Sequence, residues 1–224
     1  MELFHEFVEK RGFRGIKLYP NLGYFPTDVK LMELYQLCET RKIPILAHCS
    51  PGGIRRKGIS AEQARVFATP SNYEEVLKTF PKLNVCLAHF GGVEEWERQI
   101  KGQARGEGVE PSWLAIILKM MTDGNYPNLF TDISYTVFCQ SPADRPFNYF
   151  DYLKVLLSDK KVADHVLFGT DFYMVEQEKF TEKEVSLALR SHLGEEMYFK
   201  IAHDNPRVYL YETMLKETKK KTNK

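Results

Sequence analysis

Short apolar runs alternate with amphipathic stretches along most of this chain. Between the runs, apolar residues recur at helical spacing, as at Leu31, Leu34, Tyr35 and Cys38, which predicts helices with one buried face. Strands that alternate with such helices indicate βαβ units and a parallel sheet. Five runs have the length and content of buried strands: residues 15–19, 42–48, 84–89, 129–134 and 166–171.

Several helix starts can be read from polar residues. The motifs at residues 71–74 (Ser-Asn-Tyr-Glu) and 181–184 (Thr-Glu-Lys-Glu) fit the spacing of a capping box. Asn205 followed by Pro206 suits the N-cap and first position of a helix. We therefore predict that the last helix begins at Asn205, with the Asn205 side chain as its cap.

Polar residues follow three of the apolar runs. His48, His89 and Asp171 each close a run, at the strand end where parallel α/β folds collect ligands and catalytic groups. Lys17, from the first run, can point into the same interior if the strands form one barrel. Imidazole and carboxylate side chains are ligands for Zn²⁺ and similar divalent metals. A single such histidine is also explained as a hydrogen-bonded core residue, but the set of three favours a site.

Composition narrows the class of protein. Of the 224 residues, 43% are hydrophobic and the net charge is +1, so neither nucleic acid nor a membrane surface is an expected partner. The four cysteines form no CxxC pair, and we find no signal peptide, so a reduced cytoplasmic setting is expected. We expect Cys49 to fill the core, residues 1–215 to form one domain, and residues 216–224 to be a basic, disordered tail.

Two further candidates are weaker. Arg55 lies in a glycine-flanked loop after the His48 run, where it could meet a substrate carboxylate, although a solvated loop explains it equally well. Asp132 lies near the end of its run as an additional acid, but the sequence shows no partner for it.

Four segments together resemble a known family. Residues 12–20, 43–49, 87–92 and 168–171 look like strands four, five, six and eight of the amidohydrolase superfamily, and residues 205–210 are similar to the start of its terminal helix. The most similar branch contains aminocarboxymuconate-semialdehyde decarboxylase. The resemblance implies an α/β fold of the (β/α)₈ TIM-barrel type, represented here by its last five strands.

The resemblance also implies roles for individual residues. His48 would be a metal ligand, His89 a second ligand or an acid/base group, and Asp171 a ligand or the base that acts on the metal-bound nucleophile. Lys17 matches a strand-four lysine, which would position an anionic substrate or, in some superfamily members, is carbamylated. The implied cofactor is a divalent metal, with zinc the expected ion.

The chain departs from the family pattern at one place. The His-x-His pair of the family's first strand is absent, so we expect either a missing N-terminal segment or a partner, such as a second copy, that covers the open barrel. We expect weak or no metal binding by the chain alone. Three hypotheses for its function, with a small-molecule substrate in the first two, remain: a hydrolase of C–N or C–O bonds, a non-oxidative decarboxylase, or an inert remnant or binding module.

Overall fold

A computed structural model describes residues 2–104, 106–124, 126–136, 149–177 and 181–212 of the chain. The tail predicted at 216–224 lies outside this part. No helix within the described ranges is long and apolar enough to cross a bilayer.

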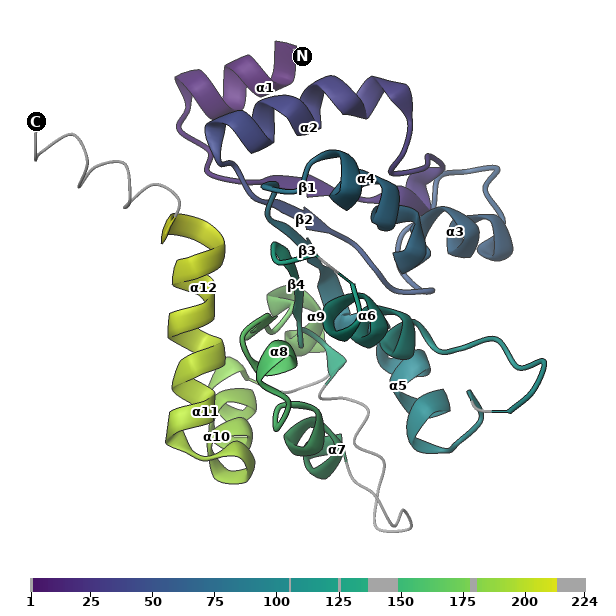
Figure 1. The fold of residues 1–224 in the computed structure, drawn as a ribbon, viewed down its shortest axis with the longest axis vertical. Helices are drawn as coiled ribbons and strands as arrows, with labels where there is room; N and C mark the ends of the chain where they lie inside the picture. Colours follow the sequence, from purple (N-terminus) through teal and green to yellow (C-terminus); the bar gives the residue numbers. More distant parts are fainter. Residues whose placement is uncertain (1, 105, 125, 137–148, 178–180, 213–224) are drawn as a thin grey trace, which may run out of the picture.

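The centre of the described structure is one sheet of five parallel strands, arranged in their order along the chain (Figure 1). The register places Ile16 beside Ile45, Ile45 beside Val85, and Val85 beside Leu129. This arrangement confirms the predicted parallel sheet, with β1 and β5 at its two ends. The strands are β1 (Ile16–Leu18), β2 (Ile45–Ala47), β3 (Val85–Leu87), β4 (Leu129–Asp132) and β5 (Val166–Leu167).

Helices follow every strand, as the alternating pattern predicts. The N-terminal helix α1 (Glu2–Phe4) continues as a π-helical turn over His5–Lys10, and the C-terminal helix runs through α11, π-helical turns and α12 to Glu212. The remaining helices are α2 (Val29–Arg41), α3 (Ala61–Ala68), α4 (Tyr73–Thr79), α5 (Val93–Ile100), α6 (Trp113–Thr122), α7 (Tyr149–Leu156), α8 (Lys160–Ala163), α9 (Phe172–Gln177) and α10 (Glu182–Leu193), with α11 at Glu195–Phe199 and α12 at Asn205–Arg207.

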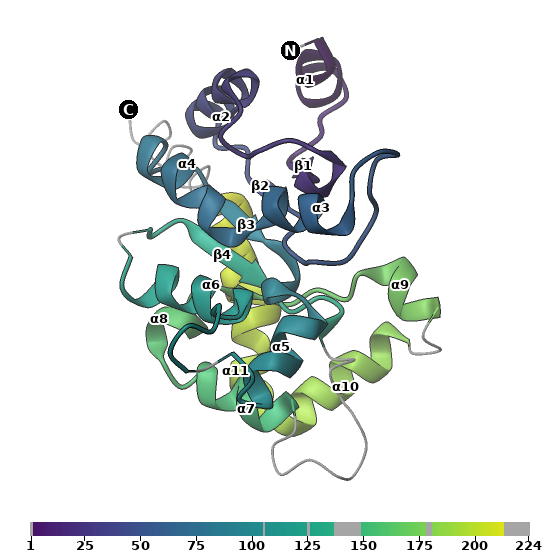
Figure 2. The same cartoon turned by 90° about the vertical axis from the view of Figure 1, so that its right-hand side faces the viewer.

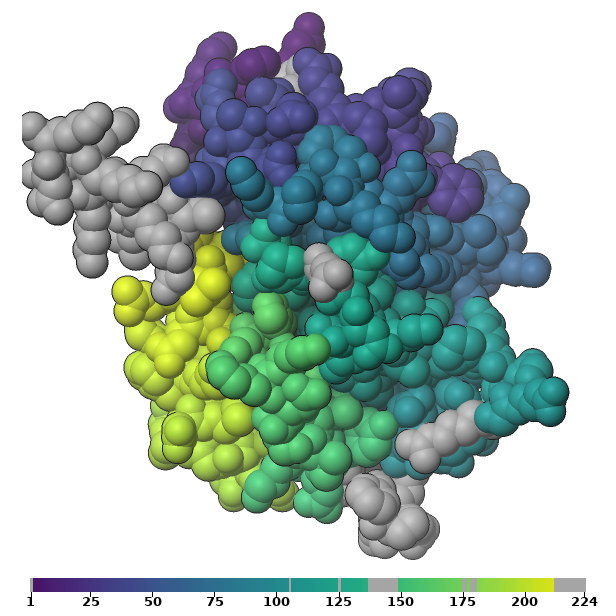
Figure 3. Space-filling view, viewed as in Figure 1, coloured from purple at the N-terminus to yellow at the C-terminus, as the bar shows by residue number. Residues whose placement is uncertain are grey.

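The two faces of the sheet have different cores. Val85 and Leu87 belong to a large core cluster with the helices, whereas Cys86, which points the other way, packs with Phe130 and Tyr209. Figures 1 and 2 show the reason: α2, α4 and α6 cover one face, while the C-terminal helix crosses the other. In the space-filling view the yellow C-terminal segment lies directly against the green α7–α8 segment (Figure 3).

The last helix does not begin at Asn205, so that prediction is wrong. Asn205 has helical backbone angles within a helix that already runs from α11. Its side-chain nitrogen instead donates hydrogen bonds of 2.7 Å to the carbonyl oxygens of Ala163 and Val166. The asparagine therefore ties the C-terminal helix to the beginning of β5.

The predicted capping boxes had different outcomes. The box at Thr181 and Glu184 is confirmed, with both reciprocal hydrogen bonds present. The box predicted at 71–74 is wrong, because the preceding 3₁₀ turn leads directly into α4, which has no side-chain cap. Ser60 and Gln63 form a capping box at α3 that the sequence analysis missed.

Candidate functional site

Three buried polar side chains meet at the carboxyl edge of the sheet. His48 follows β2 directly, His89 lies in the 3₁₀ turn Ala88–Gly91 after β3, and Asp132 is the last residue of β4. Their exposed fractions are 6%, 9% and 7%. Buried polar groups at this depth are costly unless they are paired, so their partners define what the site can do.

The two histidine rings contact each other. His89 Nε2 lies 3.2 Å from His48 Nδ1, and His48 Nε2 lies 3.0 Å from the carbonyl oxygen of Gly52. A carbonyl only accepts, so the His48 proton is on Nε2 and its Nδ1 carries a lone pair that faces His89. Tyr19 stacks on His48, with 4.2 Å between ring centroids and 14° between planes.

Burial keeps His48 neutral. Desolvation by burial lowers the pKa of His48 from 6.5 to about 4, and the neighbouring His89 and, more weakly, the positive charge of Lys17 add to this shift. Hydrogen bonds to the backbone of Gly52 and Ser50 oppose the shift, because they favour the charged ring. At neutral pH His48 is therefore a neutral imidazole with a free lone pair on Nδ1, which is the form that binds metal.

A hydrogen-bonded chain runs from His89 to a buried carboxylate. Ser134 Oγ lies 2.8 Å from His89 Nδ1 and donates a short hydrogen bond to Asp132 Oδ1. The same carboxylate oxygen accepts the backbone N–H groups of His89 and Ser134, each at 3.0 Å. Asp132 was a candidate in the sequence without a visible partner, and Ser134 was not predicted, although the Asp-x-Ser spacing at the end of a strand was the available signal.

The backbone at His89 is strained, and Asp132 holds it. His89 and Phe90 both have left-handed backbone angles, with φ of +67° and +44°, a conformation that costs free energy in residues with a Cβ atom. The hydrogen bond from the His89 N–H to Asp132 stabilises this turn. As a result, one carboxylate fixes both the backbone and, through Ser134, the ring of His89.

Asp171 lies beyond the end of its strand. Strand β5 ends at Leu167, so the predicted run to Asp171 is too long, and the exposed Asp171 lies four residues further on with a left-handed φ of +59°. Tyr19, however, has a pKa raised first by burial and additionally by the negative charge of Asp171. Asp171 is thus electrostatically coupled to the tyrosine that stacks on His48.

Lys17 and Arg55, the two predicted substrate contacts, lie on different elements of the structure. Lys17 is an exposed residue of β1 and lies in register with Leu46, on the sheet face that carries Cys86. Arg55 is exposed in the loop that follows His48. Cys49 is fully buried with its thiol 3.8 Å from the Ala68 carbonyl oxygen, which confirms its place in the core.

The two imidazoles fit part of a metal site. Nitrogen ligands at tetrahedral zinc are about 3.3 Å apart, close to the 3.2 Å between His48 Nδ1 and His89 Nε2. A catalytic zinc site takes three protein ligands. Within the described ranges no group of three or more His, Cys, Asp or Glu side chains is arranged to hold an ion, so the structure brings together two of the three predicted ligands.

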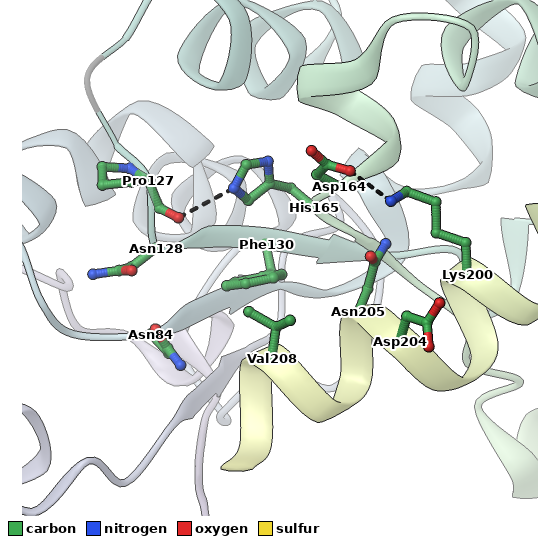
Figure 4. Close-up of a pocket in the computed structure, with 10 residues that line it drawn as sticks. All are labelled: Asn84, Pro127, Asn128, Phe130, Asp164, His165, Lys200, Asp204, Asn205 and Val208. Carbon is green, nitrogen blue, oxygen red and sulfur yellow. Dashed lines mark hydrogen bonds and ion pairs between the residues drawn. The ribbon is translucent and has the colours of Figure 1, made fainter. Parts of the chain in front are cut away.

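A cavity of about 430 Å³ lies at the opposite end of the strands (Figure 4). Its lining includes Asn84, Asn128 and His165, which precede β3, β4 and β5. The charged groups that border it are already paired, because Lys200 Nζ lies 2.6 Å from Asp164 and His165 Nε2 lies 3.1 Å from the Pro127 carbonyl oxygen. The histidine pair, at the carboxyl edge, is therefore the better candidate for chemistry.

Comparison with known proteins identifies the family of this chain. The amidohydrolase family model matches residues 2–209, so the chain belongs to the amidohydrolase family. A search of curated proteins found no match.

Solved structures with a similar fold are TIM barrels of this superfamily. An uncharacterised TIM-barrel protein from Bordetella bronchiseptica has a TM-score of 0.58 at 22% identity, over 93% of this chain and 61% of that chain. 4-Oxalomesaconate hydratase from Rhodopseudomonas palustris has a TM-score of 0.57 at 18% identity, over 98% of this chain and 62% of that chain. Dihydroxybenzoic acid decarboxylase from a Polaromonas species, with bound manganese, has a TM-score of 0.53 at 12% identity, over 93% of this chain and 64% of that chain.

These comparisons define the architecture. The chain spans about three fifths of the length of the solved barrels that it resembles, and its open sheet is a partial barrel of the TIM type. Hydratases, hydrolases and decarboxylases all occur among the similar structures.

Proposed function

We propose that this chain carries part of the metal centre of a divalent-metal-dependent hydrolase that cleaves a C–N or C–O bond of a small molecule. The observation that carries the proposal is the contact of His48 Nδ1 with His89 Nε2 at the carboxyl edge of neighbouring parallel strands. Members of the superfamily generally bind divalent metals, as the manganese-bound neighbour illustrates. Zinc is the proposed ion because both contacting donors are imidazoles.

In this proposal each residue has a defined task. His48 and His89 would hold the ion through the two nitrogens that face each other, and Asp171 would serve as the third ligand or as the base. A bound divalent ion lowers the pKa of its water ligand and so supplies a nucleophile at neutral pH. Lys17, whose charge acts on His48, and Arg55, which is exposed in the loop after His48, would bind a carboxylate of the substrate.

His89 has a hydrogen-bond acceptor for its ring N–H on the side away from the ion. When Nε2 acts as a donor atom to the ion, the proton of His89 is on Nδ1 and is donated to Ser134 Oγ, which in turn donates to Asp132. This chain of hydrogen bonds would fix the tautomer and the ring orientation of His89, as carboxylate partners of metal-binding histidines do.

We propose a cytoplasmic location for this protein. Of the cysteines that the structure describes, Cys38, Cys49 and Cys86 are free and buried, as expected where thiols stay reduced.

Equilibrium dialysis with Zn²⁺ and Mn²⁺ tests the metal assignment. We expect weak zinc binding by the parent chain and its loss in His48→Ala and His89→Ala, while His203→Ala, which changes an exposed histidine outside the site, binds like the parent. Equal zinc affinity in all four proteins would contradict the proposal.

A substrate panel of lactones, amides and carboxylated aromatics then separates the functional classes. Release of an acid or amine identifies a hydrolase, and release of carbon dioxide identifies a decarboxylase. Zinc binding without turnover in the chain and in any longer form of the protein would indicate an inert binding module.

A further inference from the structure

The backbone segment after His48 folds back onto the His48 ring. Residues 50–54, which we name the strap, bring the Gly52 carbonyl oxygen to 3.0 Å from His48 Nε2. The ring is thus held on three sides: Tyr19 stacks on its plane, His89 faces Nδ1, and the strap faces Nε2. The orientation of His48 therefore depends on where the strap lies.

A fully buried asparagine anchors the strap. Asn21 Nδ2 donates to the carbonyl oxygens of Ser50, at 3.3 Å, and Gly52, at 2.9 Å. The Gly52 oxygen consequently accepts from both Asn21 and His48, which uses both of its lone pairs. Because a buried N–H donor is costly unless it is hydrogen-bonded, the contacts of Asn21 Nδ2 favour one position of the strap.

Tyr19 provides the second anchor. Its hydroxyl oxygen accepts the backbone N–H of Ile54 at 3.0 Å, while its ring stacks on His48. Tyr19 and Asn21 flank Pro20 at the beginning of the 3₁₀ turn that follows β1. One short segment after β1 therefore holds both ends of the strap.

The strap packs so closely against His48 and Tyr19 that only glycine is accommodated at position 53. Gly53 has a φ of +104°, and a Cβ atom there would lie 2.8 Å from His48 Nε2 and still closer to the Tyr19 hydroxyl. Such contacts are shorter than real Cβ atoms make, so any side chain at this position would displace the strap or the ring.

We propose that the strap is a positioning element for His48, with Asn21 and Tyr19 as the positioning residues that hold it. Gly52 fixes the proton of His48 on Nε2, so that the lone pair of Nδ1 faces the same point as His89 Nε2. The inference rests on the proposed function, in which Nδ1 of His48 is a metal ligand. It adds that the segments 19–21 and 50–54, outside the ligands themselves, set the tautomer and direction of that ligand.

Two glycine substitutions in the same loop provide the test. Gly53→Ala inserts the clashing methyl group, whereas Gly58→Ala introduces a side chain at a similar φ of +92° with nothing within 4 Å. Both variants strain the backbone, but only Gly53→Ala disturbs the contact with His48. A third variant, Tyr19→Phe, keeps the stacked ring and removes only the acceptor for the Ile54 N–H.

Nitrogen-15 NMR of the histidine rings reports the tautomer directly in the presence of EDTA. We expect the parent and Gly58→Ala to show His48 in a single form protonated on Nε2, and Gly53→Ala to show a mixture of the two tautomers. Tyr19→Phe should show an intermediate shift. An unchanged His48 signal in folded Gly53→Ala would overturn the proposal; if Gly53→Ala does not fold, an unchanged signal in Tyr19→Phe would overturn it.

Zinc affinity separates this inference from the proposed function. We expect Gly53→Ala to bind zinc about 10- to 100-fold more weakly than Gly58→Ala, as when a hydrogen-bond partner of a ligand is lost. If the tautomer changes but none of the proteins binds zinc, the strap positions His48 and the metal assignment fails. If the parent binds zinc through His48 and Gly53→Ala keeps both the tautomer and the affinity, the metal assignment stands and the strap proposal fails.

Discussion

His89 Nε2 lies 3.2 Å from His48 Nδ1, although 41 positions of sequence separate the two residues. The contact arises because both residues leave adjacent parallel strands at the same edge, with Ala47 and Leu87 in register. Asp132, at the end of the next strand, completes the arrangement by holding His89.

The first prediction concerns the acid sensitivity of His48. Its pKa is about 4 in the native protein against 6.5 as the ordinary value, so the unfolded chain takes up a proton as the pH falls below 6.5 while the native chain does not. His48 therefore leaves the free energy of unfolding unchanged above about pH 6.5 and lowers it progressively between pH 6.5 and 4. The loss between pH 7 and 5 should be about 2 kcal/mol.

Urea unfolding with EDTA present, at pH 7 and pH 5, measures this loss. His48→Gln should show a smaller loss than the parent, since it lacks the titrating ring. An NMR titration of His48 with a midpoint above pH 6 would contradict the prediction.

The second prediction follows from the observed role of Asn205. Asn205→Ala leaves the buried carbonyl oxygens of Ala163 and Val166 without this donor, so we expect a loss of about 2–4 kcal/mol in the free energy of unfolding. The adjacent Asp204→Ala is the control, because Asp204 makes no capping hydrogen bond. Chemical denaturation of both variants checks the difference, and equal stability would show that the tie to β5 contributes nothing.

The third prediction concerns Ser134. Ser134→Ala removes the link between His89 Nδ1 and Asp132 but keeps the buried carboxylate. We expect zinc affinity to fall by about 10- to 100-fold, with little change in thermal stability. Ser158→Ala, which removes an exposed serine hydroxyl, should bind zinc like the parent. A similar affinity for both variants would remove Ser134 from the proposed site.

The fourth prediction concerns Glu95, which is only 1% exposed in the structure. Its carboxylate pairs with Arg65 and Arg98, each at 2.9 Å, and accepts the backbone N–H of Trp113. Glu95→Gln removes the buried charge that faces Arg98 and leaves Arg65 only the exposed Glu110, 3.9 Å away. We therefore expect the free energy of unfolding to fall by about 3 kcal/mol.

Glu97→Gln, on the same helix, is the matched control. Glu97 pairs with Lys101 at the surface, and exposed pairs contribute at most about 1 kcal/mol. Thermal unfolding of the two variants compares them directly, and equal melting temperatures would show that the buried pairs are not stabilising.

Local patterns predicted the elements better than their ends. The run from 84 to 89 indicated a strand, yet β3 stops at Leu87 and His89 lies in a left-handed turn. An apolar run indicates buried residues, and burial continues beyond the last hydrogen bond between the strands. The same effect made the run to Asp171 look like strand, although β5 ends at Leu167.

The partners of polar residues were less predictable. Asn205 next to a proline fits an N-cap by local preference, but its donors reach Ala163 and Val166, about 40 positions earlier in the chain. Asp132 had no visible partner in the sequence because its contact with His89 spans 43 positions. Local preference gives no information about which carbonyl or N–H group is brought near by packing.

The sequence by itself determined the parallel α/β architecture, the order of strands and helices, and the placing of His48 and His89 at strand ends, because periodicity and apolar runs are properties of neighbouring residues. Only the tertiary structure decided that the two rings touch, that Asp132 and Ser134 hold His89, that the strap contacts His48, and that Asp171 lies exposed beyond the end of β5. These relationships depend on the register of β2, β3 and β4 and on the turns beyond them. They arise from packing between distant segments, where a shift of one residue would turn each side chain to the other face of the sheet.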